Sequence, residues 1–193
     1  ERAGAKVVTK VFRNLGAEDI RQSVDEYRKA IAGAQIVMFP GGFSAGDEPE
    51  GSAKFFATVF RNAVMKEELE KLLNERDGLM LGICNGFQAL VKSGLLPYGR
   101  LGLVTKESPT LFRNDINRHI SQIVTTRVAT TASPWLAGFR LGDLHSIAVS
   151  HGEGKFVVSE ELARELFANG QVAFQYADAE GNPTVEAPYN PNG

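Results

Sequence analysis

The stretch G-L-M-L-G-I-C-N-G-F-Q, residues 78–88, decides how this sequence can fold. Its first six residues form an apolar run, which is typical of a short buried strand. Residues 87–92 then place apolar side chains at helical spacing. A cysteine stands at the junction, with Gly82 two positions before it and Gly86 two positions after it. The pattern predicts a strand, a sharp turn and a helix, with Cys84 at the turn.

This turn suits a nucleophile better than a structural cysteine. Side chains at Gly82 and Gly86 would collide with neighbouring backbone in so sharp a turn, so the glycines let the thiol project from the sheet. The N-terminus of the following helix favours a thiolate through its free N–H groups and its dipole. Cys84 is the single cysteine of the chain, which excludes an internal disulfide and a thiolate metal cage. We therefore interpret Cys84 as a nucleophile; the alternative is a packed core residue, as many free cysteines are.

A second glycine-rich turn follows the other apolar run. Residues 34–39 predict a short buried strand, which Pro40, Gly41 and Gly42 bring to an end. Acyl transfer needs backbone N–H donors for the developing oxyanion, one after the nucleophile and one from a loop behind another strand. Asn85 and Gly42 are our candidates for these donors. By itself the glycine pair would be an ordinary turn, and it has neither the dinucleotide-binding nor the P-loop spacing, so we do not expect nucleotide binding.

The rest of the chain alternates short apolar runs with longer segments at helical spacing, which predicts an α/β fold. Residues 52–74 carry an apolar stripe and predict one long crossover helix. In the second half, β-branched residues alternate with polar ones, which predicts antiparallel strands beside a parallel core. The other predicted elements are a last helical turn over residues 1–5, a strand over 6–11, antiparallel strands within 102–128 and 144–158, a helix over 159–168, a strand over 172–176 and a turn at 181–183.

Size and charge narrow the classes of function. The 193 residues suffice for one domain with a sizeable core. The formal charge is -2, from 21 basic and 23 acidic residues mixed along the chain, so the sequence shows no clustered positive charge that would favour binding to nucleic acid or to an anionic membrane. No apolar run approaches the roughly 20 residues of a membrane span, and no signal peptide is visible. We expect a cytoplasmic protein that binds a small ligand.

Four motifs give the sequence a family resemblance. They are P-G-G-F-S-A-G-D-E (residues 40–48), G-I-C-N-G-F-Q (82–88), S-H-G-E-G-K-F (150–156) and Y-N-P-N-G (189–193). With them the sequence resembles class I glutamine amidotransferases, and more narrowly the C-terminal glutaminase domain of phosphoribosylformylglycinamidine synthase. Residues 46–55 look more like the large single-chain form of that enzyme. The resemblance implies a three-layer, mostly parallel, flavodoxin-like sheet flanked by helices, with additional antiparallel strands.

The resemblance also implies a mechanism. Cys84 would attack the carboxamide of L-glutamine and release ammonia from a γ-glutamyl thioester. Ammonia would pass to a synthetase domain of the same longer chain, which converts formylglycinamide ribonucleotide to formylglycinamidine ribonucleotide in purine biosynthesis. ATP and magnesium would belong to that domain, and no cofactor or metal is expected in this one. The expected substrate-binding residues are Gly41, Phe43, Gln88, His151, Gly152 and Glu153; for Gln88 a plain position in the first helical turn is the alternative, and for His151 and Glu153 local or solvated roles.

The chain departs from the family pattern in its general base. The family supplies a His-x-Glu pair, which the resemblance places after Gly193. We therefore expect residues 1–193 to be one glutaminase domain truncated at both ends, without its first strand and its base. His151 and Glu153 have the right spacing for such a pair, but the resemblance assigns them to the substrate segment. A fragment without the base would have little activity of its own.

Three other interpretations of the function remain open. The chain could be the glutaminase of another amidotransferase. It could be a peptidase-like or deglycase-like relative with a cysteine elbow, although those enzymes usually have histidine where this chain has Asn85. It could also be a docking domain that keeps the fold without turnover, since the His-x-Glu pair is absent. Labelling of Cys84 by a glutamine analogue, with protection by free glutamine, would separate a functional elbow from a docking domain.

Overall fold

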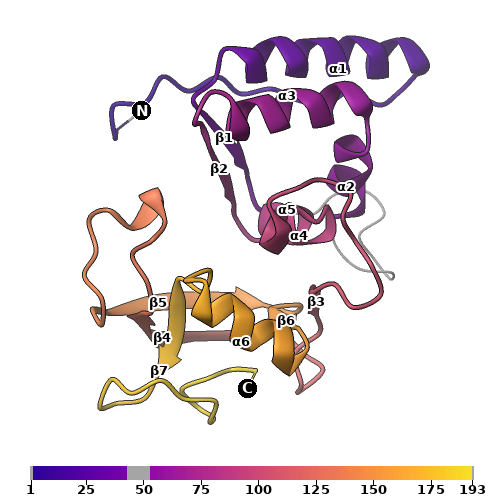
Figure 1. Cartoon of the computed structure of the whole chain (residues 1–193). Helices are drawn as coiled ribbons and strands as arrows, with labels where there is room; N and C mark the ends of the chain where they lie inside the picture. Colours follow the sequence, from indigo (N-terminus) through magenta and orange to yellow (C-terminus); the bar gives the residue numbers. More distant parts are fainter. Residues whose placement is uncertain (1, 43–52, 193) are drawn as a thin grey trace. The chain divides into compact units, whose positions relative to one another are not determined.

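The computed structural model describes residues 2–42 and 53–192, which divide into two compact units, Glu1–Val104 and Thr105–Gly193. Helices dominate the first unit and strands the second (Figure 1). The predicted α/β class with both parallel and antiparallel strands is confirmed. The expectation of one glutaminase domain with incomplete ends stays a prediction.

The first unit is built on a parallel pair of strands. β1 (Ile36–Phe39) pairs with β2 (Leu79–Gly82), and its last residue, Phe39, lies opposite Gly82. Both strands lie where the apolar runs predicted them. β2 leads directly into α4 (Asn85–Lys92), and the short α5 (Leu95–Tyr98) follows. The chain therefore forms the predicted strand, turn and helix around Cys84.

In the described part of the crossover between these strands, residues 53–74 form two helices rather than the one predicted over residues 52–74. α2 (Lys54–Phe60) and α3 (Ala63–Asn74) are separated at Asn62. The Asn62 side chain accepts hydrogen bonds from the backbone N–H groups of Val64, at 3.0 Å, and Met65, at 3.3 Å. An asparagine in extended conformation that caps two free donors begins a new helix. The apolar stripe continues across the break, and this continuity concealed the break in the sequence.

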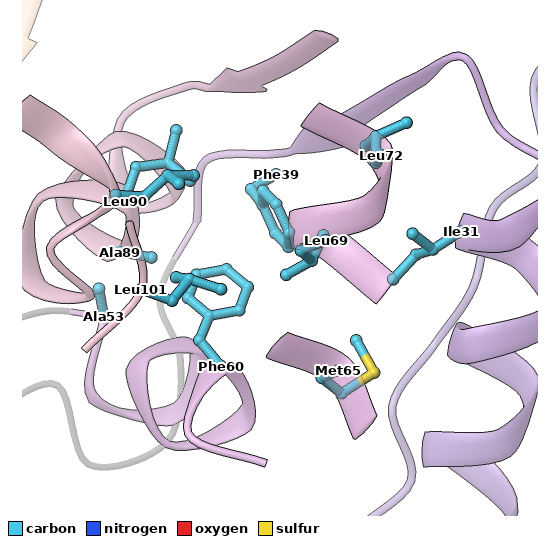
Figure 2. Packing of buried hydrophobic residues seen from close by; sticks show 11 residues of the cluster. Ile31, Phe39, Ala53, Phe60, Met65, Leu69, Leu72, Ala89, Leu90 and Leu101 are labelled. Carbon is cyan, nitrogen blue, oxygen red and sulfur yellow. The ribbon is translucent and has the colours of Figure 1, made fainter. Parts of the chain in front are cut away.

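The core of the first unit lies between the helices and the parallel strands. Figure 2 shows Phe60 and Leu69 next to Phe39 of β1, with Met65 further away in the same cluster, and all four side chains are buried. The rings of Phe39 and Phe60 meet edge to face, with centroids 4.8 Å apart. Burying an aliphatic or aromatic side chain of this size stabilises a fold by about 1.5–3 kcal/mol. The cluster therefore holds the carboxyl ends of β1 and β2 in place.

α1 (Ala17–Ala32) precedes β1 and packs beside α3 (Figure 1). Our sequence reading did not predict this helix. Its few apolar residues, Ile20, Val24, Tyr27 and Ile31, do recur at helical spacing. Charged residues dominate the rest of its surface, with ion pairs such as Glu18–Arg21, and they obscured the stripe.

The strand predicted over residues 6–11 is wrong. No regular structure is assigned there, and Val7, Val8 and Val11 are 58%, 64% and 73% exposed. A strand needs a neighbour that accepts and donates its ladder hydrogen bonds, and no described strand pairs with this segment. The predicted helical end is also wrong for the residues described, since residues 2–4 form a turn and a bend.

The second unit consists mainly of antiparallel strands. β3 (Thr110–Phe112) pairs with β6 (Lys155–Val157), and the order of the larger sheet is β5 (Leu144–His151), β4 (Ile120–Val128), β7 (Phe174–Ala177). A short 3-10 helix (Pro134–Leu136) and α6 (Glu160–Ala168) complete it. The predicted antiparallel strands and the helix after Ser159 are confirmed, and Ser159 Oγ caps the helix by accepting from Leu162 N–H at 3.3 Å.

Membrane insertion has no support in the described part of the chain. None of its helices has both the length and the apolar character that crossing a bilayer requires.

Candidate active site

Cys84 occupies the turn between β2 and α4. Its backbone has φ 53 and ψ -113, a left-handed conformation that a residue with a side chain rarely adopts. The cysteine is exposed, whereas the next two residues, Asn85 and Gly86, are buried. Gln88 N–H donates to Cys84 O at 3.0 Å, so Cys84 begins the helix. The strained turn thus presents the thiol to solvent at a helix N-terminus.

The glycines on both sides of Cys84 are required by sterics. A Cβ on Gly86 would lie 2.1 Å from the carbonyl oxygen of Phe39, and one on Gly82 would lie 2.7 Å from the carbonyl oxygen of Gly86. Atoms cannot approach so closely, so neither position accepts a side chain without movement of the backbone. The collision expected from the sequence is confirmed, and β1 is its main source at Gly86.

The Pro-Gly-Gly turn after β1 lies beside the cysteine. A Cβ on Gly41 would lie 3.0 Å from Cys84 Cβ and 3.6 Å from Cys84 Sγ, so Gly41 is within contact distance of the nucleophile. Gly42 follows with φ 131, a conformation open to glycine. Both glycines are exposed. The structure therefore brings together the two turns that the sequence proposed as a pair, while the donor roles of Gly42 and Asn85 stay predictions.

Gln88 and Phe43 are the other residues predicted for this part of the site. Gln88 lies in the first turn of α4 and is only 9% exposed. Its role toward glutamine stays a prediction. Phe43 lies outside the described residues, as does the rest of its motif up to residue 48.

The second group of predicted residues lies in the second unit. His151 ends β5, and Gly152, Glu153 and Gly154 connect it to β6. Because β5 and β6 belong to different sheets, this connection joins the two sheets of the unit. Gly152 is exposed and Glu153 is half-buried. We call residues 150–154 the β5–β6 loop.

Asn114, in the connection between β3 and β4, holds this loop. It is 2% exposed, and its Nδ2 donates to the carbonyl oxygens of His151, at 2.7 Å, and Arg118, at 2.9 Å. Its backbone N–H donates to Gly152 O at 3.0 Å. Its Oδ1 accepts from Gly154 N–H at 3.4 Å and lies 2.9 Å from His151 Nδ1. Asn114 therefore holds the loop at three residues, with its side-chain amide at His151 and Gly154 and with its backbone N–H at Gly152.

The C-terminal motif joins the same network. Asn192, which is 8% exposed, donates from Nδ2 to Asn114 Oδ1 at 3.2 Å. Turned over, its amide would instead donate to Pro191 O at 3.1 Å and accept from Lys155 N–H at 3.2 Å, but its oxygen would then face Asn114 Oδ1 at 3.2 Å. We adopt the first orientation because Asn114 Oδ1 can only accept hydrogen bonds. Residues of two motifs, 150–156 and 189–193, thus bond to Asn114, which the sequence motifs did not include.

His151 is held as a neutral imidazole. Burial, and then the neighbouring charge of His119, lowers the pKa of His151 below its ordinary value. Its Nδ1 faces Asn114 Oδ1, and its Nε2 is buried without a hydrogen-bond partner among the described residues. Neither ring nitrogen is hydrogen-bonded to Glu153, so the two do not form a histidine–carboxylate pair. The roles of His151, Gly152 and Glu153 in substrate binding stay predictions.

Asn114 is the residue that sequence reasoning missed. It stands in R-N-D, residues 113–115, where an asparagine next to charged residues is typical of an exposed turn. Only its burial distinguishes it, and burial of this side chain depends on partners 37 and 78 positions away along the chain. No local pattern could have indicated it.

Comparison with known proteins places the chain in a family. The model of the CobB/CobQ-like glutamine amidotransferase domain matches residues 1–193, so the chain belongs to this family. It is 37% identical over 169 residues to the phosphoribosylformylglycinamidine synthase subunit PurQ of Methanococcus maripaludis, and 34% identical over 165 residues to that of Salinibacter ruber. These alignments cover 86% and 85% of this chain but 59% and 62% of the relatives.

A solved structure shows the same fold. The glutaminase domain of Trypanosoma brucei CTPS with bound acivicin superposes with a TM-score of 0.50 and 13% identity, over 92% of this chain and 64% of that one. The predicted membership among glutamine amidotransferases is confirmed by the family model that matches residues 1–193.

Proposed function

We propose that this chain hydrolyses L-glutamine through Cys84 and supplies the ammonia for phosphoribosylformylglycinamidine synthesis. The observation that carries the proposal is the elbow, where an exposed cysteine in a strained conformation lies beside Gly41 at the start of a helix. Family membership gives the reaction class, and the names of the relatives give the pathway. The chain spans about three fifths of these relatives, so the whole enzyme's reaction is part of the proposal.

The proposed chemistry has two covalent steps. The Cys84 sulfur attacks the side-chain carboxamide carbon of glutamine, and the resulting oxyanion rests against the N–H groups of Gly42 and Asn85. The carbon–nitrogen bond then breaks, and ammonia leaves after its nitrogen has gained a proton. Water attacks the γ-glutamyl thioester, which releases glutamate and returns the thiol.

Recognition of the α-amino acid end falls to the β5–β6 loop in this proposal. The Glu153 carboxylate can attract the α-ammonium group, and Gly152 offers exposed backbone without a side chain in the way. Gln88 and Phe43 are proposed near the carboxamide end of the substrate.

None of the three histidines is proposed as the general base. His151 is engaged by Asn114, and His119 Nε2 lies 2.9 Å from Ser150 Oγ. His145 lies among aromatic rings, with its own ring 5.0 Å from that of Phe139. The proposal takes the base from the His-x-Glu pair that the family resemblance implies.

The proposed partner is a synthetase that consumes the ammonia. ATP, magnesium and formylglycinamide ribonucleotide would bind to that partner, and no cofactor is proposed for this chain. The matched relatives are named as a separate subunit, whereas the motif at residues 46–55 favours a single longer chain. In either arrangement the glutaminase chemistry of Cys84 is the same.

The test is covalent labelling of the full-length protein. A diazo-ketone glutamine analogue should modify Cys84, as located by mass spectrometry, and free glutamine should suppress the modification. The Cys84→Ser variant is the matched control and should carry no adduct. Failure to label the wild-type protein would overturn the proposal and favour a docking domain, while labelling without glutamine protection would favour another cysteine hydrolase.

Production of formylglycinamidine ribonucleotide tests the pathway separately. With synthetase, ATP and glutamine, the wild-type protein should support this product and Cys84→Ser should not. Added ammonium salt should restore synthesis in the variant, because it bypasses the glutaminase. Glutamine hydrolysis that never supports this product would assign the chain to another amidotransferase.

A further inference from the structure

We infer that Asn114 is the positioning residue for glutamine recognition, because its buried side chain fixes both the backbone of the β5–β6 loop and the tautomer of His151. This inference rests on the proposed function, which places glutamine's α-amino acid end at that loop. Asn114 itself is not expected to touch the substrate or the reacting atoms. Its effect is on the shape and hydrogen-bonding character of the groups that do.

The backbone of the loop depends on donors from Asn114. A Cβ on Gly152 would meet nothing within 4 Å, so this position has no packing of its own, whereas a Cβ on Gly154 would lie 2.3 Å from His151 Nδ1, so this position has no room for a side chain. The Asn114 side chain holds the backbone on both sides of Gly152, because its Nδ2 donates to His151 O and its Oδ1 accepts from Gly154 N–H, while the Asn114 backbone N–H donates to Gly152 O. A glycine-containing loop held in this way keeps one conformation without ligand, which lowers the ordering cost of binding.

The tautomer of His151 follows from the same amide. Because Asn114 Nδ2 already donates to two carbonyl oxygens, the atom that faces His151 Nδ1 must be the acceptor Oδ1. Nδ1 must therefore carry the proton, and Nε2 is left as an unprotonated acceptor. The ring is then unable to donate from Nε2, and it adds no positive charge beside the position proposed for the α-ammonium group.

The network is fully used, which makes Asn114 hard to replace. Both Nδ2 hydrogens have acceptors, and Oδ1 faces donors on His151, Gly154 and Asn192. Aspartate would keep an acceptor for His151 but would lose both donations. Alanine would lose every side-chain hydrogen bond. Asn114→Asp therefore tests the hold on the loop backbone alone, whereas Asn114→Ala removes both that hold and the acceptor that sets the tautomer of His151.

The experiment measures glutamine binding in the full-length protein by competition. The glutamine concentration that half-protects Cys84 from the diazo-ketone analogue should rise about tenfold in Asn114→Ala, since loss of buried hydrogen bonds of this kind corresponds to such a factor. Asn192→Ala, which removes one donor to the network, should show the same change to a smaller degree. Alkylation of Cys84 by iodoacetamide should keep its wild-type rate in both variants.

Gln122→Ala is the matched control. Gln122 Nε2 donates to Pro188 O at 3.0 Å, so its side-chain hydrogen bond also ties the C-terminal segment to a strand, but it does so away from Asn114. Its half-protecting glutamine concentration should equal that of the wild type. A tenfold rise in this variant as well would show a general loosening of the unit and overturn the specific role of Asn114.

Nitrogen-15 NMR of the histidine rings reads the tautomer directly. His151 should be protonated at Nδ1 in the wild type and in Asn114→Asp, and should lose this preference in Asn114→Ala. An Nε2-protonated ring in the wild type would overturn the tautomer assignment, even if Asn114→Ala failed to fold. Asn114→Asp should still bind glutamine more weakly than the wild type, because the carbonyl oxygen of His151 in the loop has lost its side-chain donor.

The outcomes separate this inference from the proposed function. Wild-type labelling that glutamine does not suppress overturns the proposed function, and the inference with it. Wild-type protection together with an unchanged half-protecting concentration in Asn114→Ala overturns the inference alone.

Discussion

The first unit holds Cys84 by steric exclusion and apolar packing, whereas the second unit holds its β5–β6 loop by hydrogen bonds to a buried amide. In the first unit, Gly86 lies against the carbonyl oxygen of Phe39 in the parallel pair, and the helices bury the other side of Phe39. In the second unit, Asn114 contacts the loop directly. A close-packed turn is destabilised when a side-chain atom is added, and a buried hydrogen-bond network is destabilised when a donor or an acceptor is removed.

The difference suits the two proposed tasks. A nucleophile needs a fixed exit from the sheet, and a strained turn supplies it when the surrounding core is rigid. A recognition loop needs polar groups that face the ligand, and such groups are held best by a second layer of polar partners. Mutations should therefore act through volume in the first unit and through hydrogen bonding in the second.

The largest effect is expected for Gly86→Ala. The added methyl group would overlap the Phe39 carbonyl oxygen, so the elbow must shift or the unit must open, at a cost of more than about 4 kcal/mol. Chemical denaturation gives the stability, and labelling of Cys84 by the glutamine analogue should be lost. Gly33→Ala, whose Cβ would meet only ordinary contacts at 3.9 Å, is the control and should change neither. A stable, reactive Gly86→Ala protein would contradict steric control of the elbow.

Leu69→Ala should come next. Leu69 of α3 is fully buried in the cluster around Phe39, and truncation of such a leucine costs about 2–5 kcal/mol. The measurement is again the free energy of unfolding from a denaturant titration. Val64→Ala, on the same helix but 40% exposed, should cost much less. Equal losses for both variants would mean that the core does not lie where Figure 2 places it.

A moderate effect is expected from acid. The pKa of His151 is lower in the folded protein than its ordinary 6.5, so the unfolded chain binds more protons as the pH falls. Stability should therefore decrease as the pH drops through 6.5 toward the folded pKa, and His151 should contribute no such change at higher pH. NMR titration of the ring gives the pKa, and urea titrations at neutral and mildly acidic pH give the stability. His151→Gln should weaken the acid dependence; a ring that titrates above 6.5 would refute the prediction.

The smallest effect is expected for Asp115→Asn. Asp115 pairs with Lys155 at 2.6 Å beside the Asn114 network, but its side chain is 55% exposed. Exposed ion pairs of this kind contribute at most about 1 kcal/mol. Denaturant titration and the half-protecting glutamine concentration should both stay near the wild-type values. A loss as large as that of Asn114→Ala would show that charge, rather than the buried amide, holds the loop.

Local patterns predicted the regular elements near the elbow and along the second half. The apolar runs placed β1 and β2, and alternation placed the antiparallel strands, because burial of one or both faces of a strand leaves a local trace. The break at Asn62 was not predicted, because the apolar stripe continues across it. The helix Ala17–Ala32 was not predicted either, because charged residues dominate its surface. The strand expected over residues 6–11 failed because pairing depends on a neighbour, which local composition does not reveal.

By itself, the sequence determined the glutamine amidotransferase family and the strand, cysteine and helix of the elbow, since glycines two positions away on each side are a local steric requirement. It also indicated which motifs would matter, among them residues 150–156 and 189–193. The tertiary structure alone decided that Asn114 joins those two motifs and that Gly41 lies against Cys84. These contacts link residues 37, 43 and 78 positions apart, and such hydrogen bonds and close approaches exist only after the chain has folded.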